Sequence, residues 1–429
     1  MPVEKLDILM VCELPIWPLD QGYRVHGCNM ARALAAQGVR VGIASMTPCT
    51  DADLPGDVRR MQIAWPEADT DQRRAFIARW GGPMRWLRER IAAHQGIDPD
   101  RLAAVRTLVE QHRPEVVIGL GQHAPLMLCG LDSDVMRIWY AADEPVYFHL
   151  SCLRRMTWGS GAMRELRHRA RSIALYALVE RLFLPQLDGA IGVSPTDSRL
   201  LERIGGARRT VTIRNGVDLD YFAPSDEPVQ PHSLIFWGRM DFEPNVDAVC
   251  WFARKVWPRL KERQPDAMWR IVGKHPAEAV RQLAAIDGIE VTGPVDDIRL
   301  LARKTSVTIL PMRCGGGIKN KLLEAAAMGL PIVASSRAVR GLGLSGGPAP
   351  MRICDAAGAW CETIERLWRD ADEAANLRTA ARQWVMRHHT WRHAAQQLLM
   401  FADVHQNDAI KIAAYDQTRA AKLPKNPAA

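Results

Sequence analysis

The sequence lacks any hydrophobic run long enough to cross a membrane. Its longest stretch without a charged residue, residues 116–131, is interrupted by glycines, a proline and polar side chains, whereas a spanning helix needs about 20 mostly apolar residues. The first apolar run, Ile8–Cys12, is short and flanked by Lys5, Asp7 and Glu13, so it does not have the form of a signal peptide. We therefore expect a protein with neither a membrane crossing nor a secretion signal.

Paired-cysteine motifs and internal repeats are also missing. The nine cysteines are odd in number, form no C-x-x-C pair and have no zinc-like spacing with histidine. Reduced thiols in a cytosolic protein explain this pattern best. We expect a cytoplasmic protein that contains no metal.

The length of 429 residues, with 48% hydrophobic and 24% charged residues, is that of a globular protein of two or three domains. The net charge of +8 comes from two segments, residues 73–90 and 154–171, each with six arginines and one glutamate. These segments are interpreted either as solvated helix faces or as surfaces that dock on anionic lipid at the inner face of the membrane, and we favour docking. Nucleic-acid binding is not expected, because zinc-finger spacing and aromatic RNA-binding motifs are missing.

Short β-branched runs alternate with helical patterns, which predicts an α/β fold with mostly parallel sheets. The rhythm occurs twice, and it predicts two doubly wound Rossmann-like domains that face a cleft. The expected strands are Ile8–Cys12, 39–44, Val116–Leu120, 137–140, 189–193, 210–213, 233–237, Met268–Val272, 290–292, 307–310, 331–334 and 350–354.

The proline- and acid-rich segment after Asn215-Gly216, a turn signal, reads as a linker. We therefore expect an N-terminal domain over residues 1–222 and a C-terminal domain over 232–385. A final helix, 386–405, is expected to pack back on the first domain.

Glycine-rich loops precede two of the expected helices. Gly22 lies before helical spacing that starts at Val25, where free backbone amides favour an anionic group. The second loop contains three successive glycines, residues 315–317, before another helix. Its amides can cradle phosphate oxygens, although the Walker pattern is absent. A plain turn at the first loop and a flexible loop at the second are the alternatives.

Charged side chains accompany the second loop. Arg313, Lys319 and Lys321 supply positive charge beside the helix start, and Glu324 follows about one turn later, where it can accept hydrogen bonds from sugar or ribose hydroxyls. Arg239 follows Gly238 at the end of an expected strand, the edge at which open α/β sheets bind ligands. Its guanidinium offers a fork for a diphosphate, and a surface ion pair is the alternative.

These segments, together with Asn215-Gly-Val-Asp-Leu-Asp-Tyr-Phe222, Val193-Ser-Pro-Thr-Asp-Ser198 and Val291-Thr-Gly-Pro-Val-Asp-Asp297, resemble the group 1 glycosyltransferases. This is the large family 4 of retaining, nucleotide-sugar-dependent enzymes with the GT-B fold. The resemblance spans nearly the whole chain. Within this family, the sequence most resembles the bacterial sugar transferases that assemble exopolysaccharides and the cell envelope.

The resemblance implies roles for individual residues. Arg239 matches the arginine that contacts the donor diphosphate, and Glu324 matches the glutamate that holds the nucleoside ribose. Gly316, Gly317 and Ile318 match the turn that faces the donor sugar and phosphates. Pro294 and Val295 match the segment that holds the base, and Gly22 matches the glycine of the acceptor domain.

Two positions depart from the family pattern. Gly316 stands where the family commonly has a glutamate that touches the donor sugar, and the lysine that often follows the Gly-Arg pair is missing after Arg239. We expect Arg313, Lys319 and Lys321 to supply the lost charge, because a leaving diphosphate needs neutralisation as the bond breaks. We expect catalysis to rest on Arg239 and Lys319.

The first domain is expected to bind the acceptor, a glycan or a lipid-linked intermediate. Asp143 falls where the family often places an acidic residue or histidine beside the anomeric carbon, and it is our candidate for orienting the acceptor hydroxyl or accepting its proton. Glu144, His149 and His123 are alternatives. The activity expected is transfer of a sugar from a nucleoside diphosphate donor, with retention and without a metal or other cofactor. A nucleotide-sugar epimerase and a non-catalytic sugar-nucleotide-binding subunit are the competing interpretations.

Overall fold

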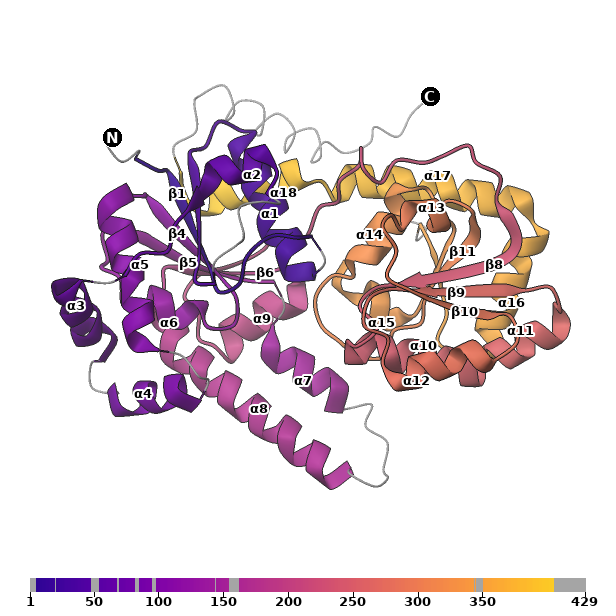
Figure 1. The fold of residues 1–429 in the computed structure, drawn as a ribbon, viewed down its shortest axis with the longest axis horizontal. Coiled ribbons are helices and arrows are strands. Elements are labelled where there is room, and N and C mark those ends of the chain that lie inside the picture. The colour runs from indigo at the N-terminus through magenta and orange to yellow at the C-terminus, as the bar shows by residue number, and fades with distance from the viewer. Residues whose placement is uncertain are drawn as a thin grey trace, which may run out of the picture.

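Two parallel β-sheets, each covered by helices on both faces, form the two halves of the protein (Figure 1). The computed structural model describes residues 5–19, 21–47, 54–67, 69–81, 85–94, 98–142, 144–153, 162–342, 344 and 350–404. Within these ranges the first sheet has seven strands in the order β3-β2-β1-β4-β5-β6-β7, and the second has six in the order β10-β9-β8-β11-β12-β13. The prediction of two doubly wound domains is confirmed.

The strands are β1 (Ile8–Cys12), β2 (Val41–Ser45), β3 (Gln62–Ile63), β4 (Val116–Leu120), β5 (Met136–Ala141), β6 (Gly189–Gly192), β7 (Thr210–Thr212), β8 (Gln230–Trp237), β9 (Met268–Val272), β10 (Ile289–Gly293), β11 (Thr305–Leu310), β12 (Ile332–Ala334) and β13 (Arg352–Ile353). The helices of the first half are α1 (Gly22–Ala35), α2 (Gly56–Met61), α3 (Thr70–Gly81), α4 (Arg85–His94), α5 (Pro99–His112), α6 (Ala124–Leu128), α7 (Pro145–Leu153), α8 (Ala162–Phe183) and α9 (Pro195–Arg203). Those that follow are α10 (Glu243–Lys255), α11 (Trp257–Arg263), α12 (Glu278–Arg281), α13 (Arg299–Ala302), α14 (Asn320–Ala327), α15 (Ser336–Val339), α16 (Ala357–Arg369), α17 (Ala371–His388) and α18 (Trp391–Phe401).

Alternation along β1 explains how the first sheet is buried on both faces. Leu9 and Val11 belong to one apolar cluster, whereas Ile8, Met10 and Cys12 belong to another. Successive side chains of a strand point to opposite faces, so these two clusters are the cores on either side of the sheet. A continuous apolar run is what a parallel strand covered on both faces requires.

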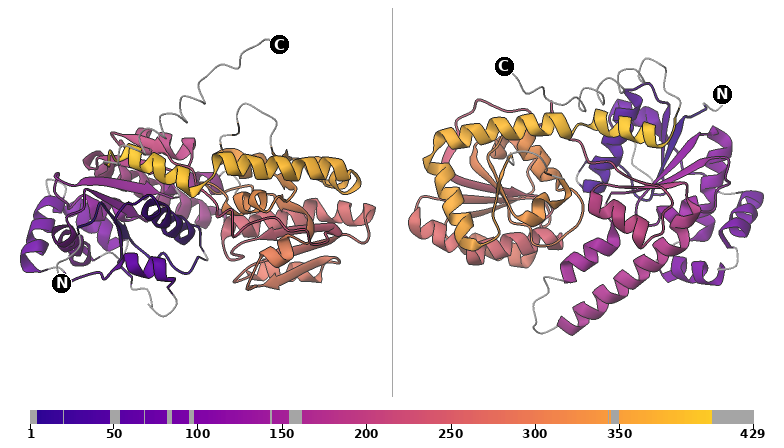
Figure 2. Two further views of the ribbon diagram at one scale, coloured as in Figure 1. Left: turned by 90° about the horizontal axis from the view of Figure 1, so that it is seen from above. Right: turned by 180° about the vertical axis from the view of Figure 1, so that it is seen from behind.

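The last two helices connect the halves. α17 packs against α14 of the second half, and α18 packs against α1 of the first, as Figure 2 shows from above and behind. Trp391 and Leu398 of α18 join the same core cluster as Ile8. The chain therefore passes between the two halves once before β8 and again between α17 and α18.

The two crossings touch each other. Val217 forms a bridge with Thr390, and a Cβ added to Gly216 would lie 2.2 Å from the backbone nitrogen of Trp391. The sequence predicted a turn at Asn215-Gly216. The structure shows instead that this glycine permits a close approach of two chain segments.

Several boundaries differ from the sequence prediction: β8 begins at Gln230 rather than at 233, and the expected final helix 386–405 is the shorter α18, Trp391–Phe401. α1 begins at Gly22, three residues before the first apolar position of its pattern at Val25. The two-residue strand β3 was not predicted, because so short a segment carries no periodicity.

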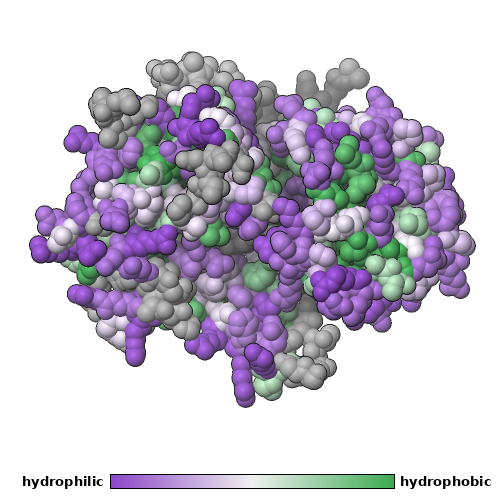
Figure 3. Space-filling view, viewed as in Figure 1, coloured by the Kyte–Doolittle hydropathy of each residue, from purple (hydrophilic) through white to green (hydrophobic). Residues whose placement is uncertain are grey.

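The arginines of residues 73–90 are largely ion-paired. Arg73, Arg79 and Arg85 lie within 3.3 Å, 2.9 Å and 2.7 Å of Asp100, Asp132 and Glu89, respectively. The face in Figure 3 is mostly hydrophilic over both halves. No helix in the described ranges is long and apolar enough to span a membrane. Lipid docking by this segment stays a prediction, with less free charge than the sequence count indicated.

Shortening Leu398 tests whether α18 is part of the first domain's core. This side chain is fully buried, so Leu398→Ala should lower the free energy of unfolding by about 2–5 kcal/mol through lost burial and the cavity left behind. The matched control is Met400→Ala on the same helix, where the side chain is 64% exposed and the change should stay below about 0.5 kcal/mol. Equal effects in urea unfolding would show that α18 does not belong to that core.

Candidate active site between the two domains

The C-terminal edge of the second sheet carries the residues that the sequence singled out. Gly238 follows β8 and Gly273 follows β9, and a Cβ on Gly273 would lie 1.7 Å from the carbonyl oxygen of Gly238. Pro294 and Val295 follow β10; Pro294 is exposed and Val295 is half-buried. The strand order places the ends of β10, β9, β8 and β11 side by side, so these segments form one continuous row.

The glycine loop after β11 ends this row. Gly315 and Gly317 have φ of 97° and 62°, a region that residues with side chains rarely adopt. Within the part of the chain that the structure describes, the amides of Gly316, Gly317 and Ile318 have no hydrogen-bond partner. Gly316 and Ile318 are buried, and buried amides without partners are rare in proteins. The loop can therefore bind an anionic ligand through its backbone.

The N-terminus of α1 faces the N-terminus of α14 across the two domains. A Cβ on Gly22 would lie 3.7 Å from Nδ2 of Asn320. Asn215 Nδ2 donates to Asn320 Oδ1 over 2.8 Å, and Asn215 Oδ1 lies 3.1 Å from Nδ1 of the buried His26. Two positive helix ends thus lie next to the glycine loop, a favourable place for negative charge.

Lys321 of α14 places a buried amine beside the strand ends of the second sheet. Its Nζ donates to Asn245 Oδ1 over 2.8 Å, lies 4.0 Å from the centre of the Phe236 ring, and would be 2.7 Å from a Cβ on Gly238. Burial, with a smaller contribution from the charge of Lys319, lowers the pKa of Lys321 to about 7. Asn245 belongs to the segment after Arg239 that lacks a lysine, so Lys321 supplies an amine at that place.

Glu324 lies one turn further along α14. Trp237 Nε1 donates to Glu324 Oε2 over 2.7 Å, and burial raises the pKa of this carboxyl group. The indole fixes one oxygen and leaves the other able to accept a hydrogen bond from a hydroxyl.

The remaining predicted cations are already engaged. Arg239 forms a two-point pair with Asp241, at 3.0 and 2.6 Å. Arg313 forms another with Asp247 of α10, at 2.9 and 2.8 Å, and Asp247 therefore neutralises the charge that the sequence assigned to the donor site. Lys319 Nζ donates to the carbonyl oxygen of Gly316, which keeps its ammonium beside the glycine loop.

Helix α7 of the first domain lies against this loop. Ser151 Oγ accepts a hydrogen bond of 2.8 Å from the amide of Gly315. The Tyr147 ring would lie 3.3 Å from a Cβ on Gly316. The structure therefore shows the loop covered by the other domain, which the sequence did not predict.

The residues considered for accepting the proton of the acceptor hydroxyl differ in their surroundings. Asp143 lies outside the described residues. Glu144 is fully buried and accepts from the amides of Val146 and Tyr147 at 2.9 and 2.6 Å, so it caps α7. Burial, with the neighbouring Glu144, raises the pKa of Glu180 to about 10.

The two histidines differ in their surroundings. Burial and Arg169 lower the pKa of His149 to about 4, so this ring is a weak base. His123 Nδ1 contacts a carboxylate oxygen of Glu13, and its backbone amide contacts the other at 3.3 Å. Because β1 and β4 are adjacent, this pair lies at the C-terminal edge of the first sheet, where a histidine held by a carboxylate can accept a proton.

Sequence families and solved structures agree with this geometry. Residues 231–370 match the family described as glycosyl transferases group 1, and residues 21–216 match the glycosyl transferase 4-like domain. The chain is a GT-B glycosyltransferase. No curated protein matches it in sequence.

Three solved structures share the fold across most of their length. Sucrose-phosphate synthase from Thermosynechococcus elongatus is 17% identical with a TM-score of 0.67, covering 97% of this chain and 100% of the other. HepE from Anabaena, in complex with UDP and glucose, is 12% identical with a TM-score of 0.63, covering 93% and 100%. WaaG, a glycosyltransferase involved in lipopolysaccharide biosynthesis, is 12% identical with a TM-score of 0.59, covering 92% and 99%.

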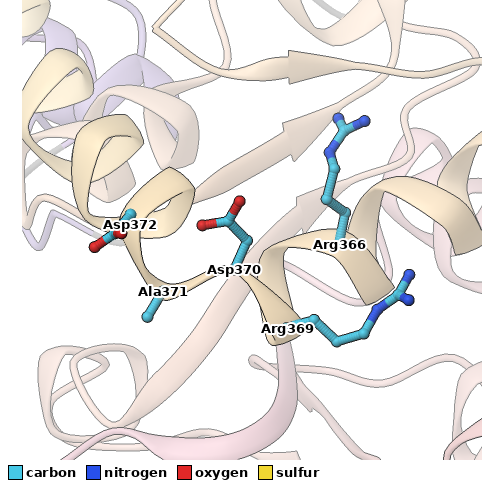
Figure 4. Close-up of a pocket in the computed structure, with 5 residues that line it drawn as sticks. All are labelled: Arg366, Arg369, Asp370, Ala371 and Asp372. Atoms are coloured by element: carbon cyan, nitrogen blue, oxygen red, sulfur yellow. The ribbon is translucent and has the colours of Figure 1, made fainter.

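A surface depression of the glycosyltransferase lies far from this row of strand ends, where α16 meets α17 (Figure 4). Arg366 pairs with Glu373 at 2.9 Å, and Asp370 caps α17 by accepting from the Glu373 amide at 2.8 Å. The labelled side chains point in different directions and leave no shared centre. This depression is an open surface feature rather than a catalytic site. In the described ranges, no group of three or more His, Cys, Asp and Glu side chains could hold a metal.

Sequence reasoning missed the residues that hold the domains together at the site. Asn320 stood inside the glycine-loop motif and its position as the first residue of α14 was a usable signal. Tyr147, Ser151 and His26 gave none, because their partners are at least 140 residues away.

The buried amine of Lys321 should make stability depend on pH. Its ordinary pKa is 10.5, so between pH about 7 and about 10 the unfolded chain binds a proton that the folded chain has released. The contribution of Lys321 to the free energy of unfolding therefore rises with pH in that window. We expect Lys321→Met to flatten the rise between pH 7 and about 9 in urea unfolding. Lys255→Met, on the exposed face of α10, is the control; identical slopes for wild type and Lys321→Met would contradict the burial of the amine.

Proposed function

We propose that this glycosyltransferase moves a sugar from a nucleoside diphosphate donor to a hydroxyl acceptor with retention of anomeric configuration. The donor binds mainly to the second domain and the acceptor to the first. No metal or other cofactor takes part, since helix ends and cationic side chains supply the charge that a leaving diphosphate needs.

The partnerless amides of Gly316, Gly317 and Ile318 are the observation that carries this proposal. They lie at the N-terminus of α14, opposite the N-terminus of α1 at Gly22. A diphosphate between the two helix ends would satisfy the amides and both dipoles. As the bond to the sugar breaks, the same groups would stabilise the charge that develops on the diphosphate.

The row along the second sheet sets the direction of the donor. The base would lie at the end of β10 beside Pro294 and Val295, and the ribose hydroxyls would bind Glu324. Arg239 and Lys321 would contact the diphosphate. An anion beside Lys321 favours its charged form, so donor binding should raise the pKa of this lysine.

Access to the loop requires the domains to move apart. Ser151 occupies the Gly315 amide and Tyr147 lies over Gly316, so a donor reaches the loop only after α7 has withdrawn. Closure of the domains around both substrates would then exclude water from the reacting centre.

We infer the acceptor from the shared fold and the location from the charge of two segments. The fold is shared with WaaG, whose description names lipopolysaccharide biosynthesis, and this supports a glycan or lipid-linked acceptor of exopolysaccharide or cell-envelope synthesis. We place the enzyme in the cytoplasm, docked on the inner face of the membrane through residues 73–90 and 154–171. His123 with Glu13 is the described pair best placed to orient the acceptor, and Asp143 stays the candidate named from sequence.

Arg239→Ala should lower kcat/KM by about 10²-fold or more, because it removes a charge that stabilises the leaving diphosphate. The side chain is 41% exposed, so Tm should change little. The assay follows release of the nucleoside diphosphate and records the anomeric configuration of the product by NMR. A folded variant with wild-type rates would refute the role of Arg239.

Three controls accompany this assay: a variant far from the site, a reaction without acceptor, and a measurement of donor binding. Arg369→Ala in the distant depression should keep the wild-type rate. Incubation with donor alone yields an isomeric nucleotide sugar if the protein is an epimerase. Donor binding with neither transfer nor slow hydrolysis would identify a non-catalytic subunit.

A further inference from the structure

A small pocket between the domains lies beside the glycine loop and contains two arginines. Its lining residues are Tyr147, Ser194, Thr196, Gly315, Gly316, Gly317, Arg337, Arg340 and Gly341. The first three come from α7 and the start of α9 in the first domain. The arginines come from α15 and the turn after it, which follow β12 in the second domain.

Neither arginine is neutralised by an acid. Arg337 Nη1 donates to the Tyr147 hydroxyl over 2.6 Å, and the guanidinium carbons of Arg337 and Arg340 lie 5.5 and 5.9 Å from the centre of the Tyr147 ring. Among the described residues, no carboxylate pairs with either guanidinium and no acidic side chain lines the pocket. A phenol and a ring face are weak partners for two cations.

Other arginines at this end of the second domain are treated differently. Arg239, Arg313 and Arg299 each form a two-point pair with an aspartate. Like charges placed close together repel unless an anion joins them. The pocket therefore has the composition of an anion-binding site: two guanidinium forks, three hydroxyl side chains and backbone amides.

The strand order places the two arginines on the side of the glycine loop that faces away from the proposed base site. The row proposed for the donor runs from β10 through β9 and β8 to β11, and β12 lies on the far side of β11. A donor with its base at β10 and its diphosphate at the glycine loop would direct its sugar, and the acceptor beyond it, towards β12. Arg337 and Arg340 therefore lie next to the glycine loop on its β12 side, where we place the sugar and the acceptor rather than the nucleoside.

We propose that Arg337 and Arg340 bind a carboxylate or phosphate carried by the sugar that is transferred or by its acceptor, so that one of the two substrates is acidic. The inference deepens the proposed function and rests on it. In the absence of substrate, Tyr147 contacts both guanidinium groups. An acidic substrate displaces it, because a two-point ion pair is stronger than a hydrogen bond to a neutral hydroxyl.

The donor arm of the test compares nucleotide sugars that differ at one carbon. Calorimetry first finds which of UDP, GDP, ADP, CDP and dTDP the full-length protein binds, and then compares a neutral nucleotide sugar with its uronate, such as UDP-glucose with UDP-glucuronate, or GDP-mannose with GDP-mannuronate. If the acid belongs to the sugar transferred, the uronate binds at least about 10-fold more tightly. Arg337→Ala/Arg340→Ala abolishes that preference and leaves the affinity for the nucleoside diphosphate unchanged. Arg369→Ala keeps the wild-type preference.

The acceptor arm uses the same variants. With the neutral donor bound, transfer to glucose 6-phosphate or glucuronate is compared with transfer to glucose. If the acid belongs to the acceptor, the acidic sugars have a KM at least about 10-fold lower, and the double variant removes the difference. Arg337→Gln and Arg340→Gln singly repeat both arms if the double variant has a much lower Tm.

The outcomes separate the two proposals. Nucleoside diphosphate binding without any acid preference in either arm, or a preference that survives the double variant, overturns the arginine site alone. If none of UDP, GDP, ADP, CDP and dTDP binds to the wild-type protein, the proposed function fails and this inference fails with it.

Discussion

The backbone amides of Gly316, Gly317 and Ile318 set the conditions that the rest of the site meets. A buried N–H without a partner costs free energy comparable to a lost hydrogen bond, and here three successive amides lack a partner among the described residues, with Gly316 and Ile318 buried and Gly317 half-buried. The surrounding residues concentrate positive potential instead of relieving it. The α1 N-terminus lies opposite, and Lys321 is held where burial lowers its pKa to about 7. Such an arrangement is stabilised only by a ligand that carries negative charge.

The same loop is where the domains meet, so ligand binding and domain position are coupled. Ser151 takes the Gly315 amide in this structure, and Asn215, on the crossing segment, donates to Asn320 at the start of α14. α7 therefore competes with an incoming anion for the loop, while the Asn215–Asn320 contact and the paired crossings at Gly216 keep the hinge compact. A donor that displaces α7 would first have to break these interdomain contacts, and their loss would lower its net binding free energy.

Sequence reasoning reached the elements whose signal is local. The continuous apolar runs at Ile8–Cys12 and Val116–Leu120 predicted their strands to the residue, because parallel strands covered on both faces leave no polar alternation. The glycine loop was found for a similar reason, since only glycine tolerates the φ of 97° at residue 315. What escaped was set by distant partners. Asp247 neutralises Arg313 from 66 positions away, and no pattern within either segment reports that pairing.

Charge shows this limit most clearly, because a count of arginines says nothing of which ones remain available. The segment 73–90 has the highest density of arginine, yet much of its charge is used in ion pairs with Asp100, Asp132 and Glu89. Arg337 and Arg340 lie in a segment of unremarkable composition but share a pocket without an acid. Two guanidinium groups without an acidic partner among the described residues have the composition of an anion-binding site, which is why we propose an acidic substrate for this pocket. Availability within the fold, rather than abundance in the chain, therefore selects the charges that determine what this enzyme binds.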